Sequence, residues 1–268
     1  MKFTNGYWLT KKEITPIYAV EYGYHRIDGN QLTIYAPSIP ITNRGDCVNI
    51  PMMTVVFQSP QENIIQVKIV HFKGGVQQGP YYHLNNKDIH VEIEETEDKI
   101  IYTSGETSAV ISKKPRDWKI EFFRSGKLLT ESSYRNIAHM TNEKTDKSYV
   151  TEQLLLDVGE KIYGLGERFT PFVKNGQIVD MWNADGGTAS EQAYKNLPFY
   201  VSNKGYGVFV NDAGDVSFEI GSEKVERVQF SVQGEQLEYM IIGGKNLKET
   251  IELYTDLTGK PALPPAWT

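Results

Sequence analysis

Cysteine is almost absent from this sequence. Cys47 is the single cysteine among 268 residues, so no intrachain disulfide can form, and no C-x-x-C pair is present to build a zinc ribbon. We expect Cys47 to act as a small buried hydrophobic residue. A chain of this length buries about 70–75% of the surface that its unfolded form exposes, so it can hold a core without covalent or metal cross-links.

Long hydrophobic runs are also missing. No stretch approaches the ~18 consecutive apolar residues of a membrane-spanning helix, and residues 1–8 lack the apolar core of a signal peptide. No Asn-x-Ser/Thr glycosylation sequon occurs in the sequence. We therefore expect a cytoplasmic protein that has no membrane partner.

Positive charge is in deficit. Lysine and arginine number 28 against 34 aspartates and glutamates, which gives a formal net charge of −6. Such a chain offers no basic surface to a nucleic acid, so no nucleic-acid partner is expected. The hydrophobic fraction of 40% and the charged fraction of 23% are ordinary for a globular protein and exclude wholesale disorder.

Alternating and aromatic segments dominate what is present. Residues 65–69 and 227–232 alternate polar and apolar side chains, which is the period of a β-strand. Asp28-Gly29 and Ser125-Gly126 separate such runs and supply the backbone angles of tight hairpins. We predict roughly fifteen or more strands between residues 17 and 242, with turns every ~8–12 residues. That spacing favours a large antiparallel sandwich or barrel over βαβ units.

One segment near the end has a helical period instead. We predict a helix near residues 246–258, in which Asn246 caps the start with Glu249 three residues on, and Gly259 ends it in a left-handed conformation. The apolar residues at helical spacing are Leu247, Ile251, Tyr254 and Leu257. The Pro-rich segment that follows the helix is expected to be a connector.

A pair of glycines, Gly164 and Gly166, has the spacing of a nucleotide-binding loop. The third glycine of that motif is missing and no helical pattern follows, so we expect no nucleotide cofactor. A tight turn with close backbone approach explains the pair better. Glu167 and Arg168, which follow it, are expected to pair with each other or with neighbours.

Histidines are few and scattered. They are His25, His71, His83, His90 and His139. No H-E-x-x-H motif occurs, so we expect no metal site. A sugar epimerase of the mutarotase type would need a His/Glu acid–base pair in a sandwich cleft, and the sequence alone cannot place any histidine beside a glutamate. No G-x-S-x-G motif indicates an acyl-transfer serine.

The segment 180–194 holds the most informative side chains. Trp182, Asn183 and Asp185 precede a Gly-Gly pair and Thr188, and the segment has no amphipathic period. An exposed surface loop is one interpretation. Contact with sugar is the other, because apolar sugar faces pack on aromatic rings while hydroxyls bind carboxylates and amides.

Six runs of residues together carry a family resemblance. These runs are 163–170, 182–188, 191–200, 204–211, 218–224 and 259–267. They resemble the N-terminal region of glycoside hydrolase family 31, and within it the bacterial α-xylosidases. The similarity is dense over residues 160–268 and looser, though colinear, before that.

The resemblance implies an all-β fold, a galactose-mutarotase-like supersandwich of antiparallel strands with one helix near 246–258. It implies an N-terminal β-sandwich domain over 1–258, while 259–268 begin the linker to a (β/α)₈ catalytic barrel that these residues do not include. Members of the family retain configuration through a carboxylate pair. Both aspartates of that pair lie on the barrel, so residues 1–268 alone are expected to be inactive.

The resemblance also assigns roles in the loop. Asp185 matches an aspartate that hydrogen-bonds sugar hydroxyls near the aglycone subsite, with Asn183 and Thr188 as neighbours and Trp182 as a platform or anchor. Ala184 stands where a basic residue is common, which leaves aglycone preference open. The implied partner is an oligosaccharide with α-linked xylose or glucose, and a homo-oligomer is expected, with no cofactor and no metal.

Two other functions remain open from the sequence. The chain could be a self-standing carbohydrate-binding module, or an interaction domain whose exposed aromatic residues form a contact surface. The sequence does not distinguish a xyloside from a glucoside substrate.

Overall fold

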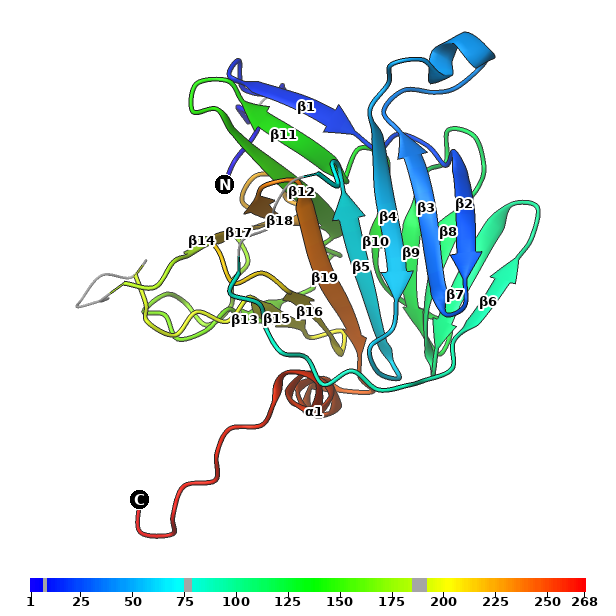
Figure 1. The fold of residues 1–268 in the computed structure, drawn as a ribbon. Helices are drawn as coiled ribbons and strands as arrows, with labels where there is room; N and C mark the ends of the chain where they lie inside the picture. Colours follow the sequence, from blue (N-terminus) through cyan, green and yellow to red (C-terminus); the bar gives the residue numbers. More distant parts are fainter. Residues whose placement is uncertain (7–8, 75–78, 185–191) are drawn as a thin grey trace.

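Antiparallel β-sheet makes up most of the protein, as a computed structural model shows (Figure 1). The structure describes residues 1–6, 9–74, 79–184 and 192–268. Nineteen strands in these ranges form three sheets, and one α-helix follows the last strand. The predicted all-β class is therefore confirmed.

The largest sheet has eight strands. In spatial order they are β13 (Ile162–Gly164), β15 (Phe199–Ser202), β16 (Tyr206–Val210), β19 (Gln236–Gly243), β5 (Ile64–Val70), β4 (Met52–Gln58), β3 (Gln31–Pro37) and β2 (Tyr24–Asp28). The chain enters this sheet at one edge early in the sequence and fills the opposite edge after residue 160. Segments far apart in sequence thus meet at β5 and β19.

Two smaller sheets complete the sandwich. The six-stranded sheet contains, in spatial order, β1 (Ile14–Tyr18), β11 (Ala138–Asn142), β12 (Lys147–Leu155), β18 (Arg227–Gln233), β17 (Val216–Ile220) and β14 (Ile178–Met181). The five-stranded sheet contains β10 (Lys127–Ser132), β9 (Ile120–Arg124), β8 (Thr107–Ser112), β7 (Lys99–Ser104) and β6 (Glu92–Glu95). The large sheet contacts both, because β5 packs on β8 while β19 packs on β9 and β12.

One core joins the three sheets. Val67, Phe122 and Phe230 come from different sheets and belong to the same buried cluster. The alternation of polar and apolar residues in β18 explains why its apolar side chains face the core, but the polar side chains in the middle of the strand are buried as well. There Gln229 accepts a hydrogen bond from Gln153 (2.7 Å) and donates to the Met1 carbonyl (3.1 Å), so burial does not leave its amide unpaired.

Helix α1 (Leu247–Thr258) confirms the predicted segment and both of its ends. The Asn246 side chain accepts a hydrogen bond from the Glu249 amide at 3.0 Å. Gly259 ends the helix with a positive φ of 103°, but its ψ of 142° lies outside the predicted left-handed helical conformation. Of the four apolar residues at helical spacing, Ile251 is not buried but 47% exposed. Thr250 is buried instead, because its hydroxyl donates to the Gly205 carbonyl at 2.7 Å where the helix packs on β16.

The burial predicted for Cys47 was also wrong. Cys47 is exposed and ends the short 3₁₀-helix η1 (Arg44–Cys47), which lies in the connection between β3 and β4. Asn43 caps this helix through its side chain, so polar contacts and not a hydrophobic core hold the segment.

The chain after α1 is extended and exposed over residues 259–268 and runs away from the sandwich (Figure 1). The domain boundary at 258/259 stays a prediction. Within the described ranges, no helix combines the length and apolar character needed to cross a membrane.

Candidate functional site

A tight turn at residues 164–166 organises the region next to the predicted site residues. Gly164 and Gly166 have φ values of 107° and 84°, and Leu165 between them has 68°. A Cβ atom on Gly166 would lie 2.1 Å from the Lys195 carbonyl oxygen. Only glycine fits at Gly166, because the backbone of residues 195–197, before β15, lies so close to it. The predicted tight turn with close backbone approach is confirmed.

Arg168 holds these segments together. Its guanidinium donates to the carbonyls of Leu165 (3.2 Å) and Asp180 (3.3 Å) and to the Asn196 side chain. Burial lowers its pKa and Asp180 partly offsets that effect. Glu167 forms an ion pair with Lys195 at 3.1 Å. The prediction that Glu167 and Arg168 pair with neighbours is confirmed.

Asn196 closes the base of the loop that leaves β14. Its side-chain amide donates to Asn183 Oδ1 at 2.8 Å and to the Trp182 carbonyl at 3.0 Å. Asn183 and Ala193 also form an isolated parallel bridge. Asn183 is thus engaged at the base of the loop, whereas the Trp182 ring is 53% exposed next to it.

The remaining predicted site residues, Asp185 and Thr188, lie outside the described residues. The sugar-binding role of all four positions stays a prediction. Ala184 is the last described residue before them, and its amide donates to the Ala193 carbonyl at 3.3 Å. In the segment 193–200, Ala193 and residues 198–200 are buried while Tyr194 is exposed, so the segment packs mainly on the sheet beneath it.

A hollow of about 630 Å³ lies beside this loop base. Phe169, Phe172 and Tyr194 line it with rings that are 76%, 78% and 69% exposed, and we call these three residues the aromatic rim. Arg168 and Lys174 line the same hollow. Exposed rings beside polar groups suit either a sugar face or a protein surface. The sequence did not predict the rim, although Phe169 belongs to the run 163–170 that carries the family resemblance.

Lys174 is a buried cation in the wall of that hollow. Its ammonium donates to Thr170 Oγ1 (2.8 Å) and to the Pro171 carbonyl (3.0 Å). Burial lowers the pKa of Lys174, and the neighbouring Arg168 adds to that effect. These bonds fold the 170–174 segment back on itself and set the position of Phe172.

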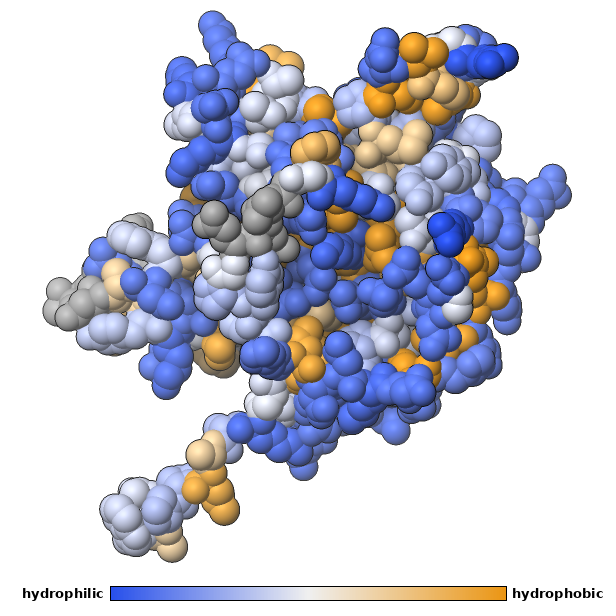
Figure 2. Space-filling model, viewed as in Figure 1, coloured by the Kyte–Doolittle hydropathy of each residue, from blue (hydrophilic) through white to orange (hydrophobic). Residues whose placement is uncertain are grey.

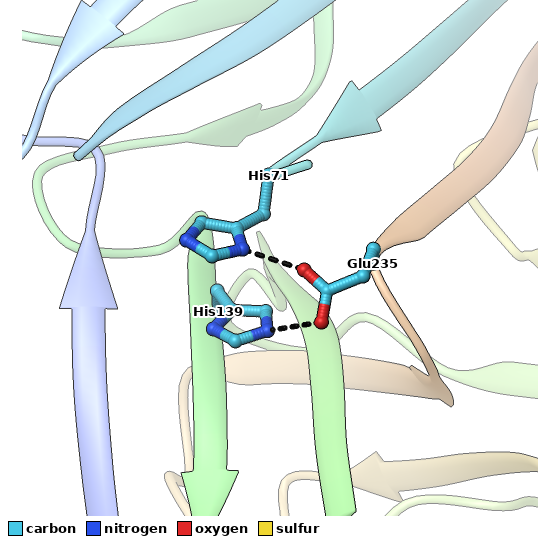
Figure 3. A group of neighbouring side chains, drawn as sticks. All are labelled: His71, His139 and Glu235. Atoms are coloured by element: carbon cyan, nitrogen blue, oxygen red, sulfur yellow. Dashed lines mark hydrogen bonds and ion pairs between the residues drawn. The ribbon is translucent and has the colours of Figure 1, made fainter. Parts of the chain in front are cut away.

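A second group of titratable side chains lies elsewhere in the sandwich (Figure 3). The two oxygens of Glu235 face two histidines, with His71 Nδ1 at 2.6 Å and His139 Nε2 at 3.1 Å. The rings of His71 and His139 are stacked, with centroids 3.8 Å apart and planes at 14°. Ser148 donates a further hydrogen bond to Glu235 at 2.9 Å. Sequence reasoning could not bring these residues together because they lie far apart in the chain.

The electrostatics of this group are consistent with its geometry. Burial raises the pKa of Glu235, but hydrogen bonds from His71, Ser148 and His139 outweigh it and leave the pKa below its usual value. Burial lowers the pKa of His139, and the adjacent His71 lowers it further. An ionised carboxylate thus faces a neutral buried imidazole at neutral pH.

Comparison with known proteins defines the family. Residues 54–219 match the family model described as the glycosyl hydrolase 31 N-terminal galactose mutarotase-like domain. An alpha-xylosidase from Lactiplantibacillus pentosus is 47% identical over 268 residues, which cover 100% of this chain. The chain belongs to glycoside hydrolase family 31.

Other members of family 31 support the same assignment. An alpha-xylosidase from Emericella nidulans is 44% identical over 287 residues, which cover 100% of this chain. Among solved structures, the family 31 dextranase from Flavobacterium johnsoniae superposes with a TM-score of 0.76 at 22% identity, over 93% of this chain and 29% of that chain. That likeness confirms the supersandwich fold.

This family 31 chain is much shorter than its relatives. It spans 35% of the Lactiplantibacillus pentosus protein and 37% of the Emericella nidulans protein. The matched model is that of the N-terminal, mutarotase-like domain.

Proposed function

We propose that these residues form the non-catalytic N-terminal domain of a retaining α-glycosidase that acts on α-xylosides or α-glucosides. The domain supports the catalytic barrel and supplies the loop after β14 to the aglycone side of the active site. The identity to two proteins named alpha-xylosidase over the whole chain carries this proposal. An oligosaccharide with an α-linked xylose or glucose is the corresponding substrate.

The geometry of the loop base supports the proposed role. Asn196, Arg168 and Gly166 fix where the loop leaves the sandwich, so a side chain on it is presented from a rigid support. The exposed Trp182 ring at the loop base is suited to pack against a sugar or against the barrel.

The first test uses the purified chain alone. We expect no hydrolysis of p-nitrophenyl α-xyloside or α-glucoside, because the carboxylate pair of a retaining glycosidase lies outside this domain. Turnover that copurifies with the chain, and that disappears when one of its own carboxylates is replaced, would overturn the proposal.

The second test concerns Asp185 in a full-length enzyme that carries this domain. A charge-assisted hydrogen bond to a sugar hydroxyl contributes roughly 1.5–3 kcal/mol, so Asp185→Ala should lower kcat/KM for disaccharides about 10- to 150-fold. Substrates with a minimal leaving group should lose less, because the contact lies on the aglycone side. The melting temperature should change little, as at an ordinary surface site.

Asn211→Ala in the same enzyme is the matched control, because Asn211 lies in the separate loop between β16 and β17. Its disaccharide kinetics should stay at the wild-type level. If the disaccharide kinetics of Asp185→Ala are unchanged, or if the loss is explained wholly by unfolding, Asp185 does not contact the sugar and is an ordinary surface residue.

A self-standing carbohydrate-binding module is the second candidate, and the aromatic rim favours it. One open hollow cannot enclose a sugar, so we expect millimolar or weaker affinity of the isolated chain for xylose and isomaltose. Calorimetric titration measures this affinity, and micromolar binding that is lost in Phe169→Ala would favour the module.

A further inference from the structure

We propose that His71, His139 and Glu235 form a binding site for a divalent transition-metal ion of the Zn²⁺ class. Two imidazoles and one carboxylate are the donor set that Zn²⁺ takes in three-ligand sites, where a water or another ligand fills the fourth position. The three donor groups lie within 4.8 Å of one another.

Three separate elements bring the donors together. His71 directly follows β5 in the eight-stranded sheet, and His139 lies on β11 in the six-stranded sheet. Glu235 lies in the turn between β18 and β19, which joins these two sheets. The His71 amide also donates to the Glu235 carbonyl at 2.9 Å, so the two backbones are held next to each other. The site is therefore built into the meeting point of two sheets.

The donor atoms need little movement to share an ion. At Zn–N and Zn–O distances of about 2.0–2.2 Å, tetrahedral ligand atoms lie about 3.4 Å apart. His139 Nε2 is already 3.1 Å from Glu235 Oε1, whereas His71 Nδ1 lies 2.6 Å from the other oxygen, Oε2, so the carboxylate must turn to place one oxygen near both nitrogens. The stacked rings must also splay so that both nitrogens point at one ion. His71 is the ring able to turn, because it is partly exposed at the end of its strand.

Metal binding would replace the two histidine–glutamate hydrogen bonds by coordination bonds. Each ring must then carry its proton on the nitrogen that faces away from Glu235. At His139 that nitrogen, Nδ1, is buried and has no hydrogen-bond partner within the described ranges. In the metal-free state the Glu235 carboxylate can only accept, so its hydrogen bond keeps the proton on Nε2, and metal binding must move that proton to Nδ1.

An entry route leads to the carboxylate. Glu235 lines a hollow of about 450 Å³ whose wall also includes Asp212, Asp215 and Tyr82. Two further carboxylates at this opening attract cations. His71 and His139 do not line this hollow, so an ion would reach the site from the side of Glu235.

Zn²⁺ bound by residues of both sheets should stabilise the folded protein. An ion that binds only the folded state shifts the unfolding equilibrium toward the folded chain by mass action. The melting temperature of the untagged chain should therefore rise as Zn²⁺ is added. Mg²⁺ should have no such effect, because it prefers an octahedral set of oxygen ligands.

The experiment measures Zn²⁺ affinity by calorimetry and the visible absorption of Co²⁺ as a probe of four-coordinate binding. All proteins carry Cys47→Ser, because the exposed thiol could bind the metal on its own. His71→Ala and Glu235→Gln each remove one donor without creating a large cavity. His25→Ala is the matched control, since His25 also faces a glutamate, Glu95 at 3.3 Å, but among the described residues belongs to no such group of three donors.

We expect one Zn²⁺ per chain, an affinity at least about tenfold weaker in His71→Ala and in Glu235→Gln, and no change in His25→Ala. The Co²⁺ absorption should disappear in the same two variants. The proposal is overturned if the chain shows neither binding nor stabilisation by Zn²⁺. It is equally overturned if binding persists unchanged in both donor variants.

Discussion

Glu152 is fully buried in the core on β12, and its surroundings set its ionisation. Ser132 Oγ donates to the carboxylate at 2.7 Å and the Gln153 amide at 2.9 Å, while Tyr239 Oη donates at 3.2 Å. Burial nevertheless raises the pKa of Glu152 to about 7, because these bonds only partly offset the loss of solvent. The folded state therefore holds a proton that the unfolded chain releases in weak acid.

The stability of the protein should depend on pH through this residue. The folded pKa of about 7 lies above the unfolded value of 4.5, so the contribution of Glu152 is complete below 4.5 and is lost as pH rises to about 7. At 1.36 kcal/mol per unit, the change amounts to about 3 kcal/mol. Glu152→Gln, which cannot ionise, should gain stability relative to wild type by about that amount between pH 4.5 and pH 8.

Urea denaturation of both proteins across this pH range measures the effect. Ser132→Ala provides the complementary variant, because it removes a hydrogen bond that favours the ionised form. That variant should lose stability more steeply with pH than wild type. A difference between Glu152→Gln and wild type that stays constant with pH would contradict the prediction.

At the scale of elements, the turn at 164–166 is the feature most sensitive to a small substitution. A Cβ on Gly166 would approach two backbone atoms, the Lys195 carbonyl oxygen at 2.1 Å and the Leu197 nitrogen at 2.9 Å. Backbone cannot rotate away as a side chain does, so the segment that closes the loop base would have to move. Gly166→Ala should therefore lower the free energy of unfolding by about 3 kcal/mol.

Gly176 offers a matched control for this prediction. Its φ of 82° is close to the 84° of Gly166, yet no heavy atom lies within 4 Å of a Cβ placed there. Gly176→Ala should cost only the backbone strain, about 1 kcal/mol. Urea denaturation of both variants separates the two effects, and equal losses would show that close approach contributes nothing.

Helix α1 shows how far element prediction from sequence extends. Capping chemistry at Asn246 and Gly259 is local, so it located both ends correctly. The buried face depends on what the helix packs against, and there the Gly205 carbonyl favours the hydroxyl of Thr250 over the side chain of Ile251. The spacing of apolar residues in the sequence does not reveal a buried polar residue whose hydrogen-bond partner lies in another element.

The group of His71, His139 and Glu235 could not be predicted from the sequence. Strand alternation predicts which side of a strand a residue takes, but not which strand becomes its neighbour. His71, His139 and Glu235 meet through the pairing of β5 with β19, of β11 with β12 and of β12 with β18. The loop at 182–188, by contrast, was recognisable because its side chains are adjacent in the sequence.

For the whole molecule, the distribution of apolar surface suggests how the chain behaves in solution. The face in Figure 2 is largely hydrophilic, with apolar side chains gathered in separate patches. The aromatic rim exposes three rings around one hollow, and the extended segment 259–268 exposes Leu263 and Trp267. Apolar patches of this kind mark surfaces that contact other proteins.

We predict that the isolated chain self-associates weakly through the aromatic rim. Two copies that pair these rings remove apolar area from water, at roughly 25 cal/mol per Å². Sedimentation at several concentrations should show a concentration-dependent average mass. Phe169→Ser with Phe172→Ser should shift the equilibrium toward monomer, because each change removes an exposed ring, although Phe172 also contacts Tyr163 at the edge of the core. Leu263→Ser should have a smaller effect, since that residue lies outside the hollow.

A strict monomer at all concentrations would contradict self-association. Equal association of wild type and the double variant would instead place the contact on another surface.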